Sequence, residues 1–332
     1  MQRTTLPARR RLLLSAAVSL TAAPALALLA ACGGGSASTT STSAGASSST
    51  QASAQAAAPA ATFPVTVTGD NGQVSIPAQP KKIVSLSPAD TEILYAIGAG
   101  PQVVAVDDQS NYPQGVPTTK LSGYKPNAEA IAGYAPDLVV LSNDDNGVVA
   151  ALTKLKVPTL VLGAPKTLDA SWTEYATLGK ATGHEAEATK AAQQVKDRIA
   201  AAVASVPAST KGLKVYHELD QTLFSATSST FIGSLYQQFG LQNIADKAKG
   251  ADSGYPQLSA EYVVKAAPDL VVLADTKCCK QTEQTLAKRP AFDTLPAVKT
   301  DKVIEANDDV VSRWGPRVAD FAELVAKELG GQ

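Results

Sequence analysis

The chain has 332 residues, of which 18% are charged and 45% are hydrophobic, and its formal net charge is −1. This length is enough for two domains with full hydrophobic cores, and the composition predicts that most of the chain is globular. The near-neutral charge, with no dense Lys and Arg cluster after the first dozen residues, argues against a nucleic-acid partner.

Residues 1–31 have the features of an export signal. Four arginines precede an apolar run, Leu12 to Leu29, that contains no charged residue. The run leads into Ala30-Ala31-Cys32-Gly33, which resembles the lipobox of bacterial lipoproteins, where the cysteine is lipidated and becomes the first residue of the mature chain. A transmembrane anchor is the alternative, but Pro24 and the small residues at the end of the run argue against it. Both the general secretory route and the twin-arginine route remain open.

Residues 32–62 are predicted to be a lipidated cysteine followed by a flexible tether. The segment is rich in Ser, Thr, Ala and Gly, and no charged residue occurs between Cys32 and Asp70. Such a composition buries too little apolar surface to offset the entropy of ordering the chain. We therefore expect an extracytoplasmic protein held at the cell membrane by lipid.

The folded part reads as two α/β lobes, residues 63–170 and residues 209–332. A hairpin is expected around Asp70-Asn71-Gly72, and short, continuously apolar strands then alternate with helices, which indicates parallel strands covered on both faces. The expected strands are 82–86, 102–107, 137–142, 158–163, 213–219, 269–274 and 301–307. The expected helices are 88–100, 126–136, 147–155, 230–240, 259–268 and 316–329.

One helix-then-strand segment occurs twice. Residues 128–141 read AEAIAGYAPDLVVL and residues 260–273 read AEYVVKAAPDLVVL, with nine identical positions and an offset of 132 residues. The repeat predicts that each copy is the same element of its own lobe, so the two lobes share one plan of mainly parallel, Rossmann-like sheets.

A linker, residues 171–208, is expected to join the lobes through one long helix. Residues 184–206 contain no Gly or Pro, and their apolar side chains recur at three- and four-residue steps. Two lobes tied by one helix make a cleft, and the loops that follow the strands should line it.

Four segments resemble motifs of the substrate-binding proteins of ABC importers for iron siderophores, haem and cobalamin. They are IVSLSPADTEILYAIG, NAEAIAGYAPDLVVLSND, YPQLSAEYVVKAAPDLVVL and DDVVSRWGPR, and they occur in the family's order between Pro80 and Leu329. The resemblance implies two lobes bridged by a rigid helix, and a monomer that delivers a small-molecule metal chelate to a membrane permease. It implies no cofactor beyond that ligand.

Enzyme and free-metal functions are the alternatives. The chain lacks G-x-S-x-G, His184-Glu185 lacks the second histidine of zinc proteases, and Gly98-Ala99-Gly100 follows a predicted helix rather than a strand. His184 is expected to be solvated and His217 to be packed within a strand. Importers for bare zinc or manganese use several His and carboxylate ligands. We expect neither a catalytic site nor a metal site, although a free-metal importer component or a secreted enzyme on the same scaffold stays possible.

The resemblance also implies one docking glutamate on each lobe, which would reach an Arg pocket of the permease. The matching positions in this sequence are Glu92 and Glu261. Both lie near the starts of predicted helices, where a carboxylate also favours the helix dipole. Glu129, the partner of Glu261 in the repeat, is interpreted as a simple helix-end charge.

Cys278 and Cys279 are the two cysteines that remain after Cys32. They follow the predicted strand 269–274 and should face the cleft in an oxidising compartment. They could form a vicinal disulfide that fixes a turn, contact the ligand, or bind a soft metal as thiols. We predict a structural disulfide with ligand contact as a secondary effect, and no free thiol in the mature protein.

Aromatic cleft residues carry over from the family onto Tyr124, Phe224 and Tyr255. Aromatic rings can cover the apolar faces of a flat or bulky metal chelate. Trp314 is a further candidate, although it could equally be a core residue at the start of a helix. Tyr124 and Tyr255 could instead cap loops.

The polar residues predicted to contact the ligand are Asn143, Asp309 and Arg313. Arg313 could pair bidentately with a ligand carboxylate, and Asp309 could accept hydrogen bonds from amides or hold Arg313. The sequence does not choose among ferric siderophore, haem and cobalamin, and our interpretation favours an iron chelate.

Overall fold

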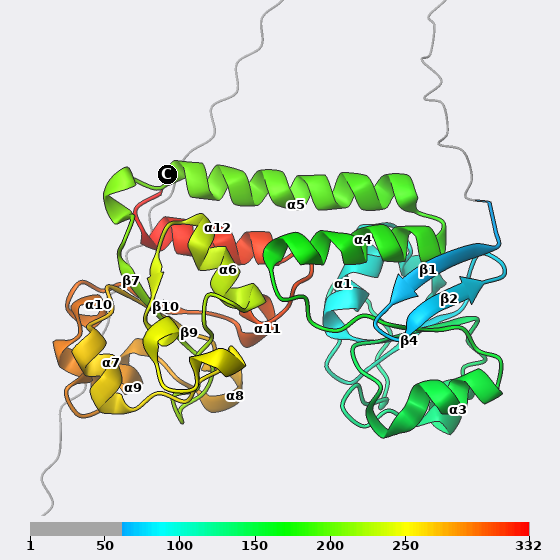
Figure 1. The fold of residues 1–332 in the computed structure, drawn as a ribbon, viewed down its shortest axis with the longest axis horizontal. Coiled ribbons are helices and arrows are strands. Elements are labelled where there is room, and N and C mark those ends of the chain that lie inside the picture. Colours follow the sequence, from blue (N-terminus) through cyan, green and yellow to red (C-terminus); the bar gives the residue numbers. More distant parts are fainter. Residues whose placement is uncertain (1–61, 332) are drawn as a thin grey trace, which may run out of the picture. The chain divides into compact units, whose positions relative to one another are not determined.

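The computed structural model describes residues 62–331, which Figure 1 shows as a ribbon. The export signal, Cys32 and almost all of the predicted tether therefore lie outside the described residues. Within 62–331, no helix is both long and apolar enough to cross a membrane.

The first lobe begins with the expected antiparallel hairpin, in which β1 (Val65–Gly69) pairs with β2 (Gly72–Ile76). Gly72 closes the turn with a φ of 92°, a left-handed conformation that favours glycine. A parallel sheet follows in the order β4-β3-β5-β6. Its strands are β3 (Ile83–Leu86), β4 (Val103–Val106), β5 (Leu138–Leu141) and β6 (Thr159–Val161). The helices of this lobe are α1 (Pro88–Ala96), α2 (Ala128–Ala132) and α3 (Val148–Lys154).

The second lobe holds another parallel sheet, in the order β10-β9-β7-β8. Its strands are β7 (Lys214–Glu218), β8 (Gln242–Asn243), β9 (Leu270–Leu273) and β10 (Val303–Glu305). Its helices are α6 (Phe231–Gln238), α7 (Ala260–Ala266), α8 (Thr276–Cys279), α9 (Glu283–Ala287), α10 (Pro296–Lys299), α11 (Asp308–Val311) and α12 (Val318–Glu328).

The two sheets have the same connectivity. In each, the first strand lies between the second and the third, and the fourth lies beside the third. The predicted repeat falls on equivalent elements, because α2 and β5 correspond to α7 and β9. Even a strained residue is repeated: Ala135 and Ala267, each followed by proline, both have a φ of 50°. The α/β prediction of two similar lobes with parallel sheets is confirmed.

Three helices form a spine along both lobes: α4 (Leu168–Thr182), α5 (Glu185–Ser205) and α12 (Figure 1). Helix α5 matches the predicted bridge and is roughly 31 Å long at about 1.5 Å per residue. The first half of α5 packs into the core of the first lobe through Ala188, Ala191 and Ala192. Its second half packs into the core of the second lobe through Val195, Ile199 and Ala202.

Helix α4 was not predicted, and the boundary expected at residue 171 falls inside it. Its sequence includes Gly179 and several Ser and Thr residues, which lower helix propensity. Its ends nevertheless carry helix signals, because Thr167 caps its start and Gly183 ends it with a φ of 80°. The helix packs between α1 and α5, and Gly179 makes this close packing possible. A Cβ there would lie 2.4 Å from the Cβ of Ala188. Trp172 on α4, like Trp314, packs against the cores of both lobes.

Candidate ligand-binding site

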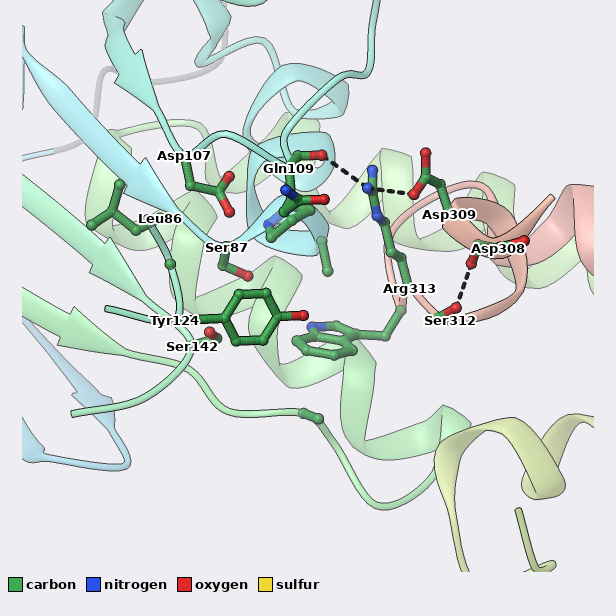
Figure 2. Close-up of a pocket in the computed structure, with 15 residues that line it drawn as sticks. Leu86, Ser87, Asp107, Gln109, Tyr124, Ser142, Asp308, Asp309, Ser312 and Arg313 are labelled. Carbon is green, nitrogen blue, oxygen red and sulfur yellow. Dashed lines mark hydrogen bonds and ion pairs between the residues drawn. The ribbon is translucent and has the colours of Figure 1, made fainter. Parts of the chain in front are cut away.

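A cavity of about 420 Å³ lies between the two lobes and is lined by loops that follow strands (Figure 2). The first lobe contributes residues after all four of its parallel strands: Ser87, Asp107 and Ser142 directly follow β3, β4 and β5, and Ala164 is the third residue after β6. The second lobe contributes only the segment after β10, residues 308–314. Parallel sheets commonly bind ligands at the carboxyl ends of their strands, so the topology defines this cavity as the candidate site.

Tyr124 is the most exposed large aromatic side chain among the described residues, at 76%. Its ring lies in the pocket, with Ser142 on one side of it and Arg313 on the other (Figure 2). Gly123 lets this segment approach β3, because a Cβ at residue 123 would lie 2.7 Å from the carbonyl oxygen of Leu86. An exposed ring supported by a closely packed backbone is well placed to meet the face of a ligand.

Arg313 is buried, at 8% exposed, and joins the two lobes. Its Nη1 donates to Glu92 Oε1 and Asn111 Oδ1, each at 3.1 Å. Its Nη2 donates to the carbonyl oxygen of Gln109 at 2.9 Å and pairs with Asp309 Oδ1 at 2.9 Å. The two Nη atoms therefore make three hydrogen bonds and one ion pair. The predicted bidentate pairing of Arg313 with a ligand carboxylate is not available without breaking these bonds.

Asp309 is the partner of Arg313 that faces the pocket. Burial alone would raise its pKa, but hydrogen bonds from Lys277 and Asn111 and the charge of Arg313 hold the pKa below its ordinary value. Oδ2 accepts from Lys277 Nζ and Asn111 Nδ2, each at 2.7 Å, whereas Oδ1 has only Arg313 as a partner. Asp309 is therefore an ionised acceptor with room for one more donor.

Glu92 is not the surface glutamate that the sequence predicted. Its residue is 1% exposed, and it accepts from Arg313 and from Arg317, whose Nε lies 3.0 Å from Oε2. A buried carboxylate with two arginine partners cannot reach another protein, so the docking prediction for Glu92 is wrong. Its role is to hold the 312–317 segment of the second lobe against α1. The ring of Tyr112 covers the Arg317 guanidinium at 4.4 Å.

Two further carboxyl groups are buried beneath the cavity. Asp90 is fully buried, neither of its carboxyl oxygens has a hydrogen-bond partner, and burial raises its pKa to about 7. Burial and the neighbouring Asp90 raise the pKa of Glu174 on α4 to about 10. Burial therefore favours the neutral form of both groups.

The charged groups on the pocket wall are mainly acidic. Asp107, Asp308 and Asp309 line it, and Arg313 is its one basic lining residue. Burial raises the pKa of Asp107 even though Ser110 donates to it. Since both Nη atoms of Arg313 are already engaged by protein groups, the wall favours ligands that donate hydrogen bonds or carry positive charge over anionic ligands.

The structure brings together four of the predicted ligand residues and leaves three outside the cavity. Tyr124, Asp309, Arg313 and Trp314 line it. Asn143 follows the lining residue Ser142, donates to its hydroxyl group at 3.4 Å, and does not line the cavity itself. Phe224 and Tyr255 also lie beyond it, on two second-lobe loops that pair at Phe224 and Gln257. Their side chains are 37% and 46% exposed.

Sequence reasoning missed Asp107, Gln109, Ser142 and Arg317. Asp107 and Ser142 each follow the last residue of a parallel strand, so the same topological rule could have found them. Arg317 lies four residues after Arg313, but nothing in the sequence indicates that both reach one carboxylate of the other lobe.

Glu261 and Glu129 occupy the same position in the two copies of the repeat. Each lies in the first turn of its helix, α7 or α2, and each is exposed. The interpretation of Glu129 as only a helix-end charge gave the two copies different roles. The structure makes them equivalent.

Cys278 and Cys279 are joined by a disulfide in α8, in the loop after β9. Cys278 is exposed, and its backbone N–H donates to Asp308, a residue of the pocket wall. Among residues 62–331, no group of three or more His, Cys, Asp or Glu side chains is arranged to hold a metal ion.

Two lobes of one plan, a helical spine and a cavity at the carboxyl ends of both sheets define a two-lobed binding protein. Comparison with known sequences makes this assignment specific. The sequence profile of the family called Periplasmic binding protein matches residues 83–310, and the chain belongs to that family.

Two curated relatives cover most of the chain. An uncharacterized ABC transporter substrate-binding lipoprotein of Bacillus subtilis, YvrC, is 28% identical over 277 residues, which cover 80% of this chain and 86% of the relative. A cobalamin-binding protein of Halobacterium salinarum is 29% identical over 270 residues, which cover 79% of this chain and 73% of the relative.

Two solved structures have the same fold at 25% identity. The periplasmic vitamin B12 binding protein BtuF of Vibrio cholerae has a TM-score of 0.62 and covers 76% of this chain and 97% of its own. The periplasmic heme-binding protein RhuT from Roseiflexus sp. RS-1 has a TM-score of 0.63 and covers 75% and 97%.

Proposed function

We propose that this protein is the extracytoplasmic substrate-binding component of an ABC importer and that its ligand is a corrinoid of the cobalamin type. The observation that carries the choice of ligand is the pocket wall, which is acidic and whose one arginine already has both Nη atoms engaged by protein groups. The relatives named for cobalamin and vitamin B12 support the same choice. The earlier preference for an iron chelate rested on the sequence alone.

The chemistry of a corrinoid suits these residues. Its rim carries primary amides, which donate hydrogen bonds that Asp308 and Asp309 can accept. Its ring faces are apolar, and Tyr124 offers an exposed aromatic ring. A corrinoid is larger than the cavity, so part of it would extend toward Phe224 and Tyr255 on the second-lobe loops.

Haem is the second candidate. A heme-binding structure shares the fold, and the phenol of Tyr124 could ligate iron. Haem carries two propionates, however, and these would meet Asp107, Asp308 and Asp309 with no free basic side chain on the wall to compensate.

Equilibrium dialysis against a panel of ligands tests the proposal. The panel contains cyanocobalamin, haemin and a ferric hydroxamate siderophore, each at matched concentration and salt. We expect cyanocobalamin to bind at least tenfold more tightly than the other two, and the bound ligand to be recovered chemically unchanged. Preferential binding of haemin or of the siderophore would reassign the ligand, and turnover of any of them would indicate an enzyme.

Delivery to a permease is proposed to use Glu129 and Glu261. Both are exposed glutamates at equivalent helix starts of the two lobes. Changing both to alanine should abolish ligand uptake by cells while leaving the affinity for cyanocobalamin within about twofold. The matched control is the exposed pair Glu185→Ala and Glu187→Ala on α5, which should leave uptake unchanged.

The anchor is proposed to be a lipid on Cys32. The basic start, the apolar run and the lipobox support it, as does the lipoprotein relative. Cys32→Ser should release the protein from the membrane fraction, and mass spectrometry of the wild-type N-terminus should find an acylated cysteine. A wild-type protein that keeps residues 1–31 would contradict the proposal.

A further inference from the structure

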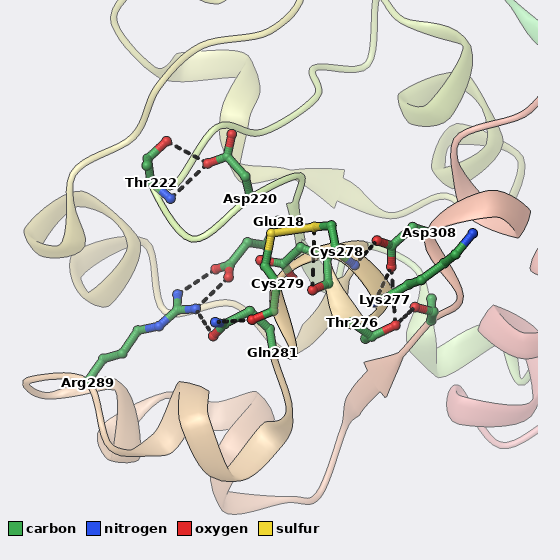
Figure 3. The surroundings of a disulfide bond; sticks show 12 residues. Glu218, Asp220, Thr222, Thr276, Lys277, Cys278, Cys279, Gln281, Arg289 and Asp308 are labelled. Carbon is green, nitrogen blue, oxygen red and sulfur yellow. Dashed lines mark hydrogen bonds and ion pairs between the residues drawn. A yellow bond between two sulfur atoms is a disulfide. The ribbon is translucent and has the colours of Figure 1, made fainter. Parts of the chain in front are cut away.

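The cysteine turn, residues 275–280, lies directly against the pocket wall of the second lobe (Figure 3). Three of its groups donate to one carboxylate, that of Asp308. They are Lys277 N at 2.8 Å, Cys278 N at 2.9 Å and Thr276 Oγ1 at 3.2 Å. The turn therefore fixes the orientation of a residue that lines the ligand cavity.

The same turn also holds Asp309. Lys277 Nζ pairs with Asp309 Oδ2 at 2.7 Å, and Asp309 in turn contacts Arg313 and, across the cleft, Asn111. This short segment therefore positions both aspartates that the second lobe contributes to the pocket wall. Through Asp309 it also supports the contact with Asn111 of the first lobe.

The backbone conformation of the cysteine turn is only weakly stabilised by its own secondary structure. Helix α8 contains only four residues and ends at Lys280, whose φ is 58°. A helix this short has no independent stability, because one turn fixes several dihedral angles for very few hydrogen bonds. The covalent bond between Cys278 and Cys279 restricts the same dihedral angles directly.

We propose that the Cys278–Cys279 disulfide is a positioning element of the ligand site, which keeps Asp308 and Asp309 in their binding geometry and makes ligand affinity sensitive to thiol reductants. The inference rests on the proposed function for the identity of the ligand but not for the positioning itself. Cys278 is exposed, so a small dithiol can reach it. Dithiothreitol would break the Sγ–Sγ bond by supplying two electrons and two protons, giving two thiols, and would itself become a cyclic disulfide.

If the disulfide were purely structural, it would rigidify the cysteine turn and nothing else. Amide exchange can distinguish that case from the positioning role, so the first measurement needs no ligand. Hydrogen–deuterium exchange is compared for oxidised protein, dithiothreitol-reduced protein and the C278S/C279S variant. We expect faster amide exchange in residues 276–280 and also in residues 308–313 when the disulfide is absent. Faster exchange in 276–280 alone would overturn the proposal.

The second measurement is the dissociation constant for cyanocobalamin. Loss of the disulfide, by reduction or in C278S/C279S, should weaken binding about tenfold, and dithiothreitol should have no further effect on the variant. Lys277→Ala should weaken binding in the same direction, whereas Lys249→Ala, an exposed lysine of the same lobe, should not. Equal affinities of the oxidised protein and the variant would overturn the proposal.

The two failures can be told apart. If oxidised protein does not bind cyanocobalamin, the proposed function fails, and the exchange of residues 308–313 alone decides on the positioning role. If cyanocobalamin binds and neither its affinity nor that exchange depends on the disulfide, the positioning role fails and the proposed function stands.

Discussion

The loops after β5 and β9 show how two copies of one structure take different roles. The strands are equivalent and 132 residues apart. After β5 the chain runs through Asn146 and Gly147, both with positive φ and no covalent link. The corresponding positions after β9 are Cys278 and Cys279, which are joined by a disulfide. The two lobes therefore share a backbone plan and differ in the chemistry of the loops that follow equivalent strands.

The walls of the cavity differ in the same way. The first lobe contributes from the loops after all four of its parallel strands, and the second contributes only residues 308–314. That one segment nevertheless carries two aspartates and the inter-lobe arginine. We infer that the first lobe offers most of the contact surface, whereas the second supplies most of the charge.

The largest expected effect comes from removing Glu92, which forms ion pairs with Arg313 and Arg317 of the other lobe. Glu92→Ala would leave Arg313 and Arg317 buried without their shared carboxylate, and removing one partner of a buried ion pair costs about 3–5 kcal/mol. Denaturant unfolding should show a loss of this size. Glu129→Ala, an exposed glutamate of the same lobe, should change stability by less than about 1 kcal/mol. Similar losses for both variants would contradict the buried role of Glu92.

A second effect concerns pH and the buried acids beneath the cavity. Burial raises the pKa of Asp90 to about 7, above its value in the unfolded chain, so the folded state binds more protons between these two values. Its contribution to stability is fully present below about pH 4 and is lost as the pH rises through about 7. Asp90 alone should therefore lower the free energy of unfolding by on the order of 2 kcal/mol from pH 5 to pH 8, and the raised pKa of Glu174 should add to this fall.

Asp90→Asn should remove much of that slope. The exposed acid Asp145 provides the control, because Asp145→Asn should leave the slope intact. An Asp90→Asn variant with the same slope as the wild type would contradict the raised pKa of Asp90.

The smallest expected effect comes from changing the two alanines that adopt the same left-handed backbone conformation in the two copies of the repeat. Ala135 and Ala267 both adopt a φ of 50°, a conformation that costs an alanine about 1–2 kcal/mol and glycine almost nothing. Glycine loses more chain entropy on folding, so Ala135→Gly and Ala267→Gly should each stabilise the protein by less than about 1 kcal/mol. Thermal unfolding should show small upward shifts for both. Destabilisation at one position only would show that the two copies are not equivalent there.

Sequence patterns predicted the parts of this protein that local physics determines. The repeat, the bridging helix and the alternation of strands with helices follow from periodicity and turn residues, and the family motif located Tyr124, Asp309 and Arg313. The partner of Arg313 was not predictable, because Glu92 lies 221 residues away and reaches it only through the packing of the lobes.

Helix α4 is a different case, because the sequence does carry signals for its ends. Thr167 caps its start and Gly183, with a φ of 80°, ends it. Phe224 and Tyr255 do not line the cavity with Tyr124, because tertiary packing places their loops beyond it. Their contact with the ligand stays a prediction.

The most direct test of the account is the affinity of one aromatic variant for cyanocobalamin. Tyr124 and Tyr134 are both exposed tyrosines of the first lobe, but only Tyr124 lines the cavity. Equilibrium dialysis should show that Tyr124→Ala weakens binding about tenfold to a hundredfold, as expected for an aromatic side chain at the centre of a binding site. Tyr134→Ala should bind like the wild type. Unchanged binding by Tyr124→Ala, in a protein that does bind cyanocobalamin, would show that the ligand occupies another site.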